Sequence, residues 1–356
     1  MTLNIFEKMT SLENTDPVLI VEMSGNHGGG LKSAEEFVDK AISLKPDVIK
    51  FQVYTPDTIT LNVRNEDFSV SSDTIWAEHN SLHELYSIAH TPWAWIEKLA
   101  AKCDAAGQPW FASPFDQSAI EFLEQIGCPA YKIASPEIND VNLIDAISKT
   151  KKPVVVSCGL GSEQEIADAI TLISRYQNNY ALLKCTSAYP APFSELNLLT
   201  IPYLQEKFNC PVGFSDHSIG KTASLVAVAL GATIIEKHFK LDEDSDSVDS
   251  EFSMPLSELA SLKLALSEAA ESRGEVSLDI TKSAIPSLSG RRSLYVSADI
   301  KAGDLFTEDN IKSVRPSFSL APRFFSTVLG KQATRDLNMG DRITAEAVEN
   351  FHICDK

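Results

Sequence analysis

The feature that most constrains the fold is a regular alternation of short apolar runs and amphipathic segments along about the first 275 residues. Runs rich in Val, Ile and Leu are typical of buried parallel strands, and most precede a segment with helical periodicity. They begin at residues 18, 47, 110, 130, 153, 180, 211 and 232. Alternating strands and helices also fit a doubly wound sheet, but the count of eight favours an α/β fold of the (β/α)8 TIM-barrel type.

The pattern changes after the last of these units. We expect an N-terminal extension (1–16), a TIM-barrel catalytic domain (17–275), a linker (276–290) and a small, mostly-β domain (291–356). A domain of that size is expected to need support from a neighbour. Inside the barrel, residues 55–91 form a long polar insertion, and such loops are usually functional lids or disordered segments.

Charge and cysteine usage exclude several classes of function. The net charge of −18 argues against nucleic-acid or anionic-membrane binding, although a few lysines in a cleft could still bind an anionic small molecule. The six cysteines include no CxxC pair and are expected to be free thiols in a reducing compartment. Because no apolar stretch approaches 18 residues, we expect a soluble, cytoplasmic protein that does not enter a membrane.

Two of the predicted strands end in a histidine. His217 closes Gly213-Phe-Ser-Asp-His, and His238 closes Glu236-Lys-His. If the strands are neighbours, the two imidazoles lie side by side at the end of the barrel where such enzymes carry their chemistry. A pair of imidazoles can hold one divalent metal ion, although two ordinary polar residues at strand tips remain an equal alternative.

Three lysines, Lys50, Lys132 and Lys184, interrupt apolar strands. A buried lysine is costly unless it is paired, so each needs a structural partner such as Glu22 or Glu236, or a bound anion. Three in one barrel favour a bound polyanion such as a phosphate with a carboxylate. Serines at strand tips would add neutral donors for phosphate oxygens. A rival mechanism is a Schiff base on one desolvated lysine.

Several motifs resemble the bacterial sialic acid synthase family, whose members condense phosphoenolpyruvate with an N-acetylated amino sugar. The region from residue 291 resembles the antifreeze-like SAF domain of that family. The resemblance spans nearly the whole chain with the motifs in order. It is carried by Glu22-Met-Ser-Gly-Asn-His-Gly-Gly, Ile49-Lys-Phe-Gln, Phe111-Ala-Ser-Pro-Phe-Asp, Tyr131-Lys-Ile-Ala-Ser-Pro-Glu-Ile, Leu183-Lys-Cys-Thr-Ser-Ala-Tyr-Pro, Gly213-Phe-Ser-Asp-His and Ile235-Glu-Lys-His-Phe.

The resemblance implies a role for each matching residue. It implies that His217 and His238 bind a divalent metal (Mn2+, Mg2+ or Co2+), and that Glu22 moves a proton or positions water, with an ion pair to Lys50 as its alternative role. Phosphoenolpyruvate is expected to be bound by Lys50, Ser113, Lys132, Ser135, Ser157, Thr186, Ser187 and Ser215. The sugar is expected to contact Glu137, Tyr189, Asp249 and Arg315. Arg315 would reach the barrel of a partner chain, which implies a domain-swapped homodimer.

Within the family, the segments Tyr54-Thr-Pro-Asp-Thr-Ile-Thr, His90-Thr-Pro-Trp-Ala-Trp and Ala188-Tyr-Pro-Ala-Pro look most like the pseudaminic acid synthases. The expected reaction joins phosphoenolpyruvate to 2,4-diacetamido-2,4,6-trideoxy-L-altrose with release of phosphate. N-acetylneuraminic or legionaminic acid synthesis from another amino sugar is the alternative. A Schiff-base aldolase and a non-enzymatic sugar-binding protein are further alternatives.

Overall fold

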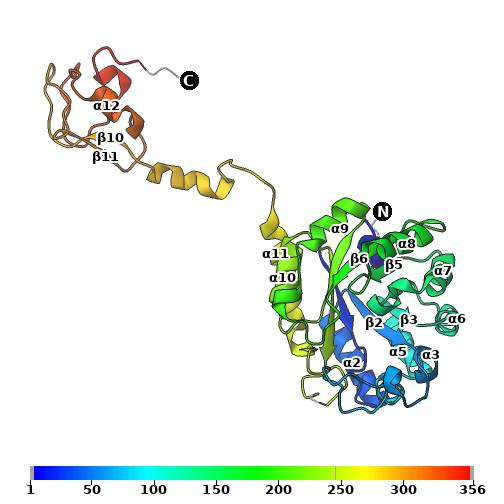
Figure 1. The fold of residues 1–356 in the computed structure, drawn as a ribbon. Coiled ribbons are helices and arrows are strands. Elements are labelled where there is room, and N and C mark those ends of the chain that lie inside the picture. The colour runs from blue at the N-terminus through cyan, green and yellow to red at the C-terminus, as the bar shows by residue number, and fades with distance from the viewer. Residues whose placement is uncertain (1–3, 245, 353–356) are drawn as a thin grey trace. The chain divides into compact units, whose positions relative to one another are not determined.

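The computed structural model describes residues 4–244 and 246–352 of the chain, which form two compact units divided after Gly274 (Figure 1). The last residues of the predicted second domain, Cys354 among them, lie outside the described residues. In the first unit, parallel strands follow one another in chain order, and pairing of the first with the eighth closes a barrel. The barrel strands are β1 Val18–Glu22, β2 Val48–Val53, β3 Trp110–Pro114, β4 Tyr131–Ile133, β5 Val154–Ser157, β6 Tyr180–Cys185, β7 Val212–Asp216 and β8 Ile234–Lys240.

Helices surround the strands, as expected for a TIM barrel (Figure 1). Their apolar faces pack on strands whose residues are almost all buried, and one continuous core results. The helices of this unit are α1 Ile5–Met9, α2 Leu31–Leu44, α3 Pro56–Ile59, α4 Leu82–Ala89, α5 Trp93–Ala106, α6 Gln117–Gln125, α7 Val141–Lys149, α8 Glu163–Ser174, α9 Thr200–Phe208, α10 Thr222–Ala229 and α11 Leu259–Arg273. The predicted barrel is therefore confirmed, and no helix in the described ranges is long and apolar enough to cross a membrane.

Strand register brings the predicted polar residues together. Glu22 lies opposite Lys50 on one side and opposite His238 on the other. Strands β7 and β8 can approach closely because residue 213 is glycine, since a Cβ there would collide with the carbonyl oxygen of Ile234. The carboxyl ends of these two strands therefore lie side by side and carry the two histidines of the sequence motif.

Two segments of the first unit are more ordered than the sequence suggested. The N-terminal extension contains α1, which is capped by Asn4 and buries Phe6 and Met9 against the barrel core. The insertion at residues 55–91 contains the short helices α3 and α4 and the 3-10 turn η1 Glu66–Phe68. It is a folded element that contributes side chains to the site described below.

The second unit, from Glu275, has its own apolar core. Strands β10 Ser293–Val296 and β11 Ile311–Val314 pair antiparallel within it, and isolated bridges join its other segments. Part of the expected linker is the exposed 3-10 helix η5 Lys282–Gly290. Arg315 follows β11 directly and is exposed.

Candidate active site

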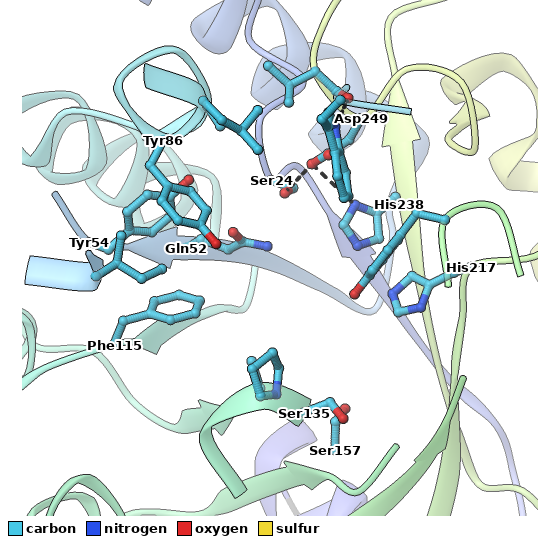
Figure 2. A pocket seen from close by; sticks show the side chains of 18 of the residues that line it. Ser24, Gln52, Tyr54, Tyr86, Phe115, Ser135, Ser157, His217, His238 and Asp249 are labelled. Carbon is cyan, nitrogen blue, oxygen red and sulfur yellow. Dashed lines mark hydrogen bonds and ion pairs between the residues drawn. The ribbon is translucent and has the colours of Figure 1, made fainter. Parts of the chain in front are cut away.

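A cavity of about 570 Å³ opens at the carboxyl ends of the barrel strands (Figure 2). Its walls come from three sources: the strand ends, the insertion at 55–91, and the loop between β8 and α11. Most of the predicted site residues line it, although they come from widely separated parts of the chain. Those that line it are Lys50, Lys132, Ser135, Glu137, Ser157, Tyr189, Ser215, His217, His238 and Asp249.

The two histidines face one wall of this cavity, with ring centroids 5.3 Å apart. Nδ1 of His217 lies 3.2 Å from the carbonyl oxygen of Thr186. His238 is buried, yet its Nδ1 has no hydrogen-bond partner among the described residues, and Asp249 Oδ2 lies 3.9 Å from it. Burial lowers the pKa of His238 well below its ordinary value, and the neighbouring charges of His217 and Lys50 lower it further. A neutral imidazole with a free nitrogen is the form that binds metal.

The donor set fits a divalent metal ion with two protein ligands. No third His, Cys, Asp or Glu completes a metal-binding cluster within residues 4–244 and 246–352. Two imidazole nitrogens would leave the remaining coordination positions to water and substrate, which is the arrangement of a catalytic rather than a structural site.

A buried network of two lysines and two glutamates forms and supports the floor of the cavity; Lys50, Lys132 and Glu236 line the cavity, whereas Glu22 is buried behind Lys50 and does not. Lys50 Nζ lies 2.6 Å from Glu22 Oε2 and 3.2 Å from Glu236 Oε2. Lys132 Nζ lies 3.4 Å from Glu236 Oε1, to which Ser215 also donates a hydrogen bond at 2.9 Å. Although burial opposes ionisation, Lys132 and Lys50 hold the pKa of Glu236 well below its usual range. The ion pair that was the alternative role for Glu22 is therefore present.

The predicted phosphate ligands fall into two groups. Ser135, Ser157 and Ser215 line the cavity, whereas Ser113 is buried beneath it and does not. The hydroxyls of Ser113 and Ser157 have no hydrogen-bond partner among the described residues. Buried hydroxyls normally have partners, so unpartnered ones at a cavity indicate a ligand or ordered water.

The residues predicted for the carboxylate of phosphoenolpyruvate are also divided. Lys50 lines the cavity, but Thr186 and Ser187 are not among its lining residues. Thr186 Oγ1 accepts a hydrogen bond from Lys184 Nζ at 3.1 Å, and Lys184 also donates to the carbonyl oxygen of Cys185 at 2.6 Å. The third strand-borne lysine is thus used in local backbone contacts, and the bound-anion prediction rests on Lys50 and Lys132.

The predicted sugar contacts of the barrel also line the cavity, and two of them, Asp249 and Tyr189, lie beside the histidines. Asp249 Oδ2 accepts hydrogen bonds from Ser24 Oγ at 2.5 Å and from the backbone N of Gly25 at 3.2 Å (Figure 2). Glu137 Oε2 is buried without a hydrogen-bond partner in the described structure, and burial raises the pKa of Glu137 to about 7. The Tyr189 ring packs 4.5 Å from that of His217, between centroids. Arg315 belongs to the second unit, so its role stays a prediction.

Sequence reasoning missed several residues of this site. Tyr86 and Trp76 come from the insertion, and Trp76 Nε1 donates a 2.7 Å hydrogen bond to the carbonyl oxygen of Val248 in the β8–α11 loop. Cys185 lines the cavity with its Sγ 3.8 Å from Nδ1 of His217. The one available signal was the aromatic content of the insertion, which does not indicate where those rings lie.

Comparison with models of known protein families shows the family to which this chain is related. Residues 37–277 match the NeuB family, and residues 291–349 match the SAF domain. This chain belongs to the NeuB family. The resemblance drawn from the sequence motifs is thereby confirmed, as is the SAF domain.

Individual members of the NeuB family show the same relationship. The chain is 43% identical to the pseudaminic acid synthase of Campylobacter jejuni strain 81-176, over 93% of this chain and 96% of that protein. It is 38% identical to the pseudaminic acid synthase of Helicobacter pylori, over 94% and 98% of the two chains. Among solved structures, the N-acetylneuraminic acid synthetase of Leptospira borgpetersenii matches with a TM-score of 0.67 at 31% identity, covering 77% of this chain and 91% of that one.

Proposed function

We propose that this NeuB-family chain is a pseudaminic acid synthase, which condenses phosphoenolpyruvate with 2,4-diacetamido-2,4,6-trideoxy-L-altrose and releases phosphate. The observation that carries the proposal is the 43% identity to a pseudaminic acid synthase over almost the whole length of both chains. The N,N'-diacetyllegionaminic acid synthase of Campylobacter jejuni is 31% identical, so the alternative acceptor is less well supported.

The residues of the cavity suit each part of this reaction. A bond forms between carbon 3 of phosphoenolpyruvate and the aldehyde carbon of the open-chain sugar, water adds at carbon 2, and the C–O bond to phosphate breaks. Lys132, with Ser135 and Ser157, binds the phosphate and stabilises it as it departs. Lys50 binds the carboxylate side. Glu22, hydrogen-bonded and ion-paired at the floor, orients the attacking water or accepts its proton.

His217 and His238 are the proposed ligands of a divalent metal ion, Mn2+, Mg2+ or Co2+. Bound there, such an ion supplies Lewis-acid polarisation of the aldehyde oxygen. The histidines' own contribution is to hold their rings 5.3 Å apart between centroids beside the lysine floor, with the lowered pKa of His238 keeping that imidazole neutral. Asp249 and Glu137 hydrogen-bond hydroxyl and amide groups of the sugar, and Tyr189 closes the wall beside His217.

The acceptor assay tests the function directly. Phosphate release and product mass are measured with phosphoenolpyruvate and a panel of hexosamine acceptors. The trideoxy diacetamido sugar is expected to give the highest kcat/KM. A higher value with the acceptor for N-acetylneuraminic or legionaminic acid would replace the proposed product. Trapping of a pyruvate adduct by borohydride would indicate the Schiff-base mechanism instead.

Metal removal tests the role of the histidines. EDTA is expected to abolish phosphate release, and Mn2+ is expected to restore it. Binding of Mn2+ to the apoprotein, followed by its electron paramagnetic resonance signal, should be lost in His238→Ala. Full activity in rigorously metal-free enzyme would contradict the assignment.

The site is proposed to be completed by Arg315 from the SAF domain of a second chain, in a domain-swapped homodimer. Arg315→Ala should raise the KM for the sugar without changing that for phosphoenolpyruvate. Mixing Arg315→Ala with His238→Ala should restore part of the activity, because hybrid dimers carry one intact site. An active monomer in light scattering would contradict the shared site. A cytoplasmic location is also proposed, because the cysteines in the described ranges are buried free thiols.

A further inference from the structure

Three aromatic rings cluster at the side of the cavity that lies away from the two histidines. Tyr54 follows β2, Phe115 follows β3, and Tyr86 lies in α4 of the insertion. Figure 2 shows these rings on one side and His217 and His238 on the other. The Tyr54 ring contacts Phe115 and Tyr86 edge-to-face, with centroid distances of 5.2 and 5.7 Å. Such contacts hold the rings in a fixed arrangement.

The wall around this cluster is uncharged and mainly carbon, with the phenol hydroxyls of Tyr54 and Tyr86 and the amide of Gln52 as polar groups (Figure 2). The insertion adds Ile59, Leu82 and Leu85 to the lining, and none of these side chains or the three rings carries a charge at neutral pH. By contrast, the carboxylate and imidazole groups of the cavity belong to the histidine wall, the network at the lysine floor, Glu137 and Asp249. The cavity therefore has a charged, reactive part and an uncharged end built mainly by the aromatic cluster.

The chemistry fixes which end of the sugar faces each part. The aldehyde must lie beside the histidines and lysines, because the new bond forms there. Hydroxyl and amide groups along the sugar chain can pair with Asp249 and Glu137. The far end of the sugar then extends toward the remaining, uncharged wall. A methyl group is stabilised against aromatic rings, whereas a hydroxyl there would exchange water for contacts that are mostly with carbon.

We propose that Tyr54, Tyr86 and Phe115 form a subsite for the methyl terminus of the acceptor, and that this subsite selects 6-deoxy sugars over 6-hydroxy sugars. The inference rests on the proposed function and extends it to the part of the cavity that chooses between acceptors. The reacting groups are the same for both sugars, so the selection acts through binding of the sugar's tail.

The experiment compares two acceptors that differ at one atom: the 2,4-diacetamido-2,4,6-trideoxy sugar and its 6-hydroxy counterpart. Discrimination against an added hydroxyl by a mainly apolar pocket is expected to be about 10- to 100-fold in kcat/KM. Phe115→Ala should bring this ratio close to one, chiefly by weakening the 6-deoxy acceptor. Tyr86→Phe, which keeps the ring, should retain the wild-type ratio, and Tyr86→Ala should lower it.

Phe122→Ala is the matched control. Phe122 is a partly buried ring in α6 that stacks on Trp93 at 5.0 Å between centroids and does not line the cavity. It should lower the melting temperature but leave the acceptor ratio unchanged. Equal use of both acceptors by the wild type, or a wild-type ratio in Phe115→Ala, would overturn the subsite alone. If the wild type releases phosphate with neither acceptor, the proposed function fails and the subsite fails with it.

Discussion

Strands β7 and β8 carry polar residues both on the face that points out of the barrel and on the face that points into it. The two sets of residues differ in how completely they are paired. On the outer face, Asp216 accepts hydrogen bonds from N and Oγ of Ser218 at 2.8 and 2.6 Å, and from Ser224 Oγ in α10 at 2.6 Å. Lys237 Nζ lies 3.1 Å from Asp216 and donates to the carbonyl oxygen of Ser218. The outer pair thus joins the two strands to each other and to the helix layer.

On the inner face, Ser215 and Glu236 are paired, but other groups are not. His238 Nδ1 has no hydrogen-bond partner within the described residues, and nearby Ser157 Oγ and Glu137 Oε2 on other elements share this property. Unsatisfied buried groups at a cavity indicate a ligand or ordered water. The contrast teaches that the outer residues hold the histidine-bearing strand ends in register, whereas the inner ones keep groups free at the cavity, where substrate is proposed to bind.

The largest expected effect is on stability and comes from the outer face. Lys237→Met leaves Asp216 buried without a cationic partner, which should lower the free energy of unfolding by about 3–5 kcal/mol in urea titrations. Activity measured well below the melting temperature should change much less. Loss of activity at unchanged stability would show that Lys237 belongs to the reactive face.

The matching change on the inner face is Lys132→Met. It removes a cation from the proposed phosphate site and should lower kcat/KM for phosphoenolpyruvate by about 10²- to 10³-fold. Because Glu236 keeps Lys50 and Ser215 as partners, stability should fall less than in Lys237→Met. Equal losses of stability in Lys132→Met and Lys237→Met would contradict the difference drawn between the two faces.

The carboxyl of Glu137 should make the stability of the protein depend on pH. Its pKa is raised by burial to about 7, so the folded state favours the protonated form. The contribution of Glu137 to stability is therefore fully present below about pH 4.5 and is lost as the pH rises through 7, by up to about 2–3 kcal/mol for this partly exposed group. Glu137→Gln should lack this decline when unfolding is measured across the range. An identical slope in the variant would assign the pH dependence to other groups.

The smallest expected effects come from a pair of serines. Ser224→Ala removes a hydrogen bond to Asp216 and should cost about 1–2 kcal/mol of stability without affecting the KM for phosphoenolpyruvate. Ser157→Ala removes an unpartnered hydroxyl, so stability should hardly change, while that KM should rise by about tenfold. The opposite outcome for either serine would contradict the division between the two faces.

Much of the barrel was predictable, because buried parallel strands are nearly continuous apolar runs. The predicted strand starts at 47, 130, 211 and 232 lie within two residues of those of β2, β4, β7 and β8. The gathering of Lys50, Lys132, His217 and His238 followed from the same logic, since a closed parallel barrel brings all carboxyl strand ends to one side. The local sequence pattern was sufficient to predict the positions of those residues that the barrel geometry alone determines.

Other parts of the site depend on contacts that local pattern does not encode. Asp216 and Lys237 stood inside recognised motifs, but their pairing requires the β7–β8 register, which follows from how the barrel closes. Tyr86 and Trp76 sit in an insertion without strand or helix periodicity over most of its length. Their positions are set by neighbours far away in sequence, such as Val248, 172 residues beyond Trp76. Helix α1 is five residues long, too short for a clear periodic signal.

The hydrogen bond from the Trp76 indole to Val248 has a consequence for how acceptor preference can diverge among relatives. It ties Trp76 of the insertion to the β8–α11 loop, so a change in the path of either segment is expected to disturb the other. Because the acceptor is a main-chain carbonyl, which every residue carries, the bond depends on the path of the loop, and a chimaera that receives only one segment from a homologue would lose the fit between the two. Transferring the acceptor preference of one relative to another should therefore require both segments to be exchanged together.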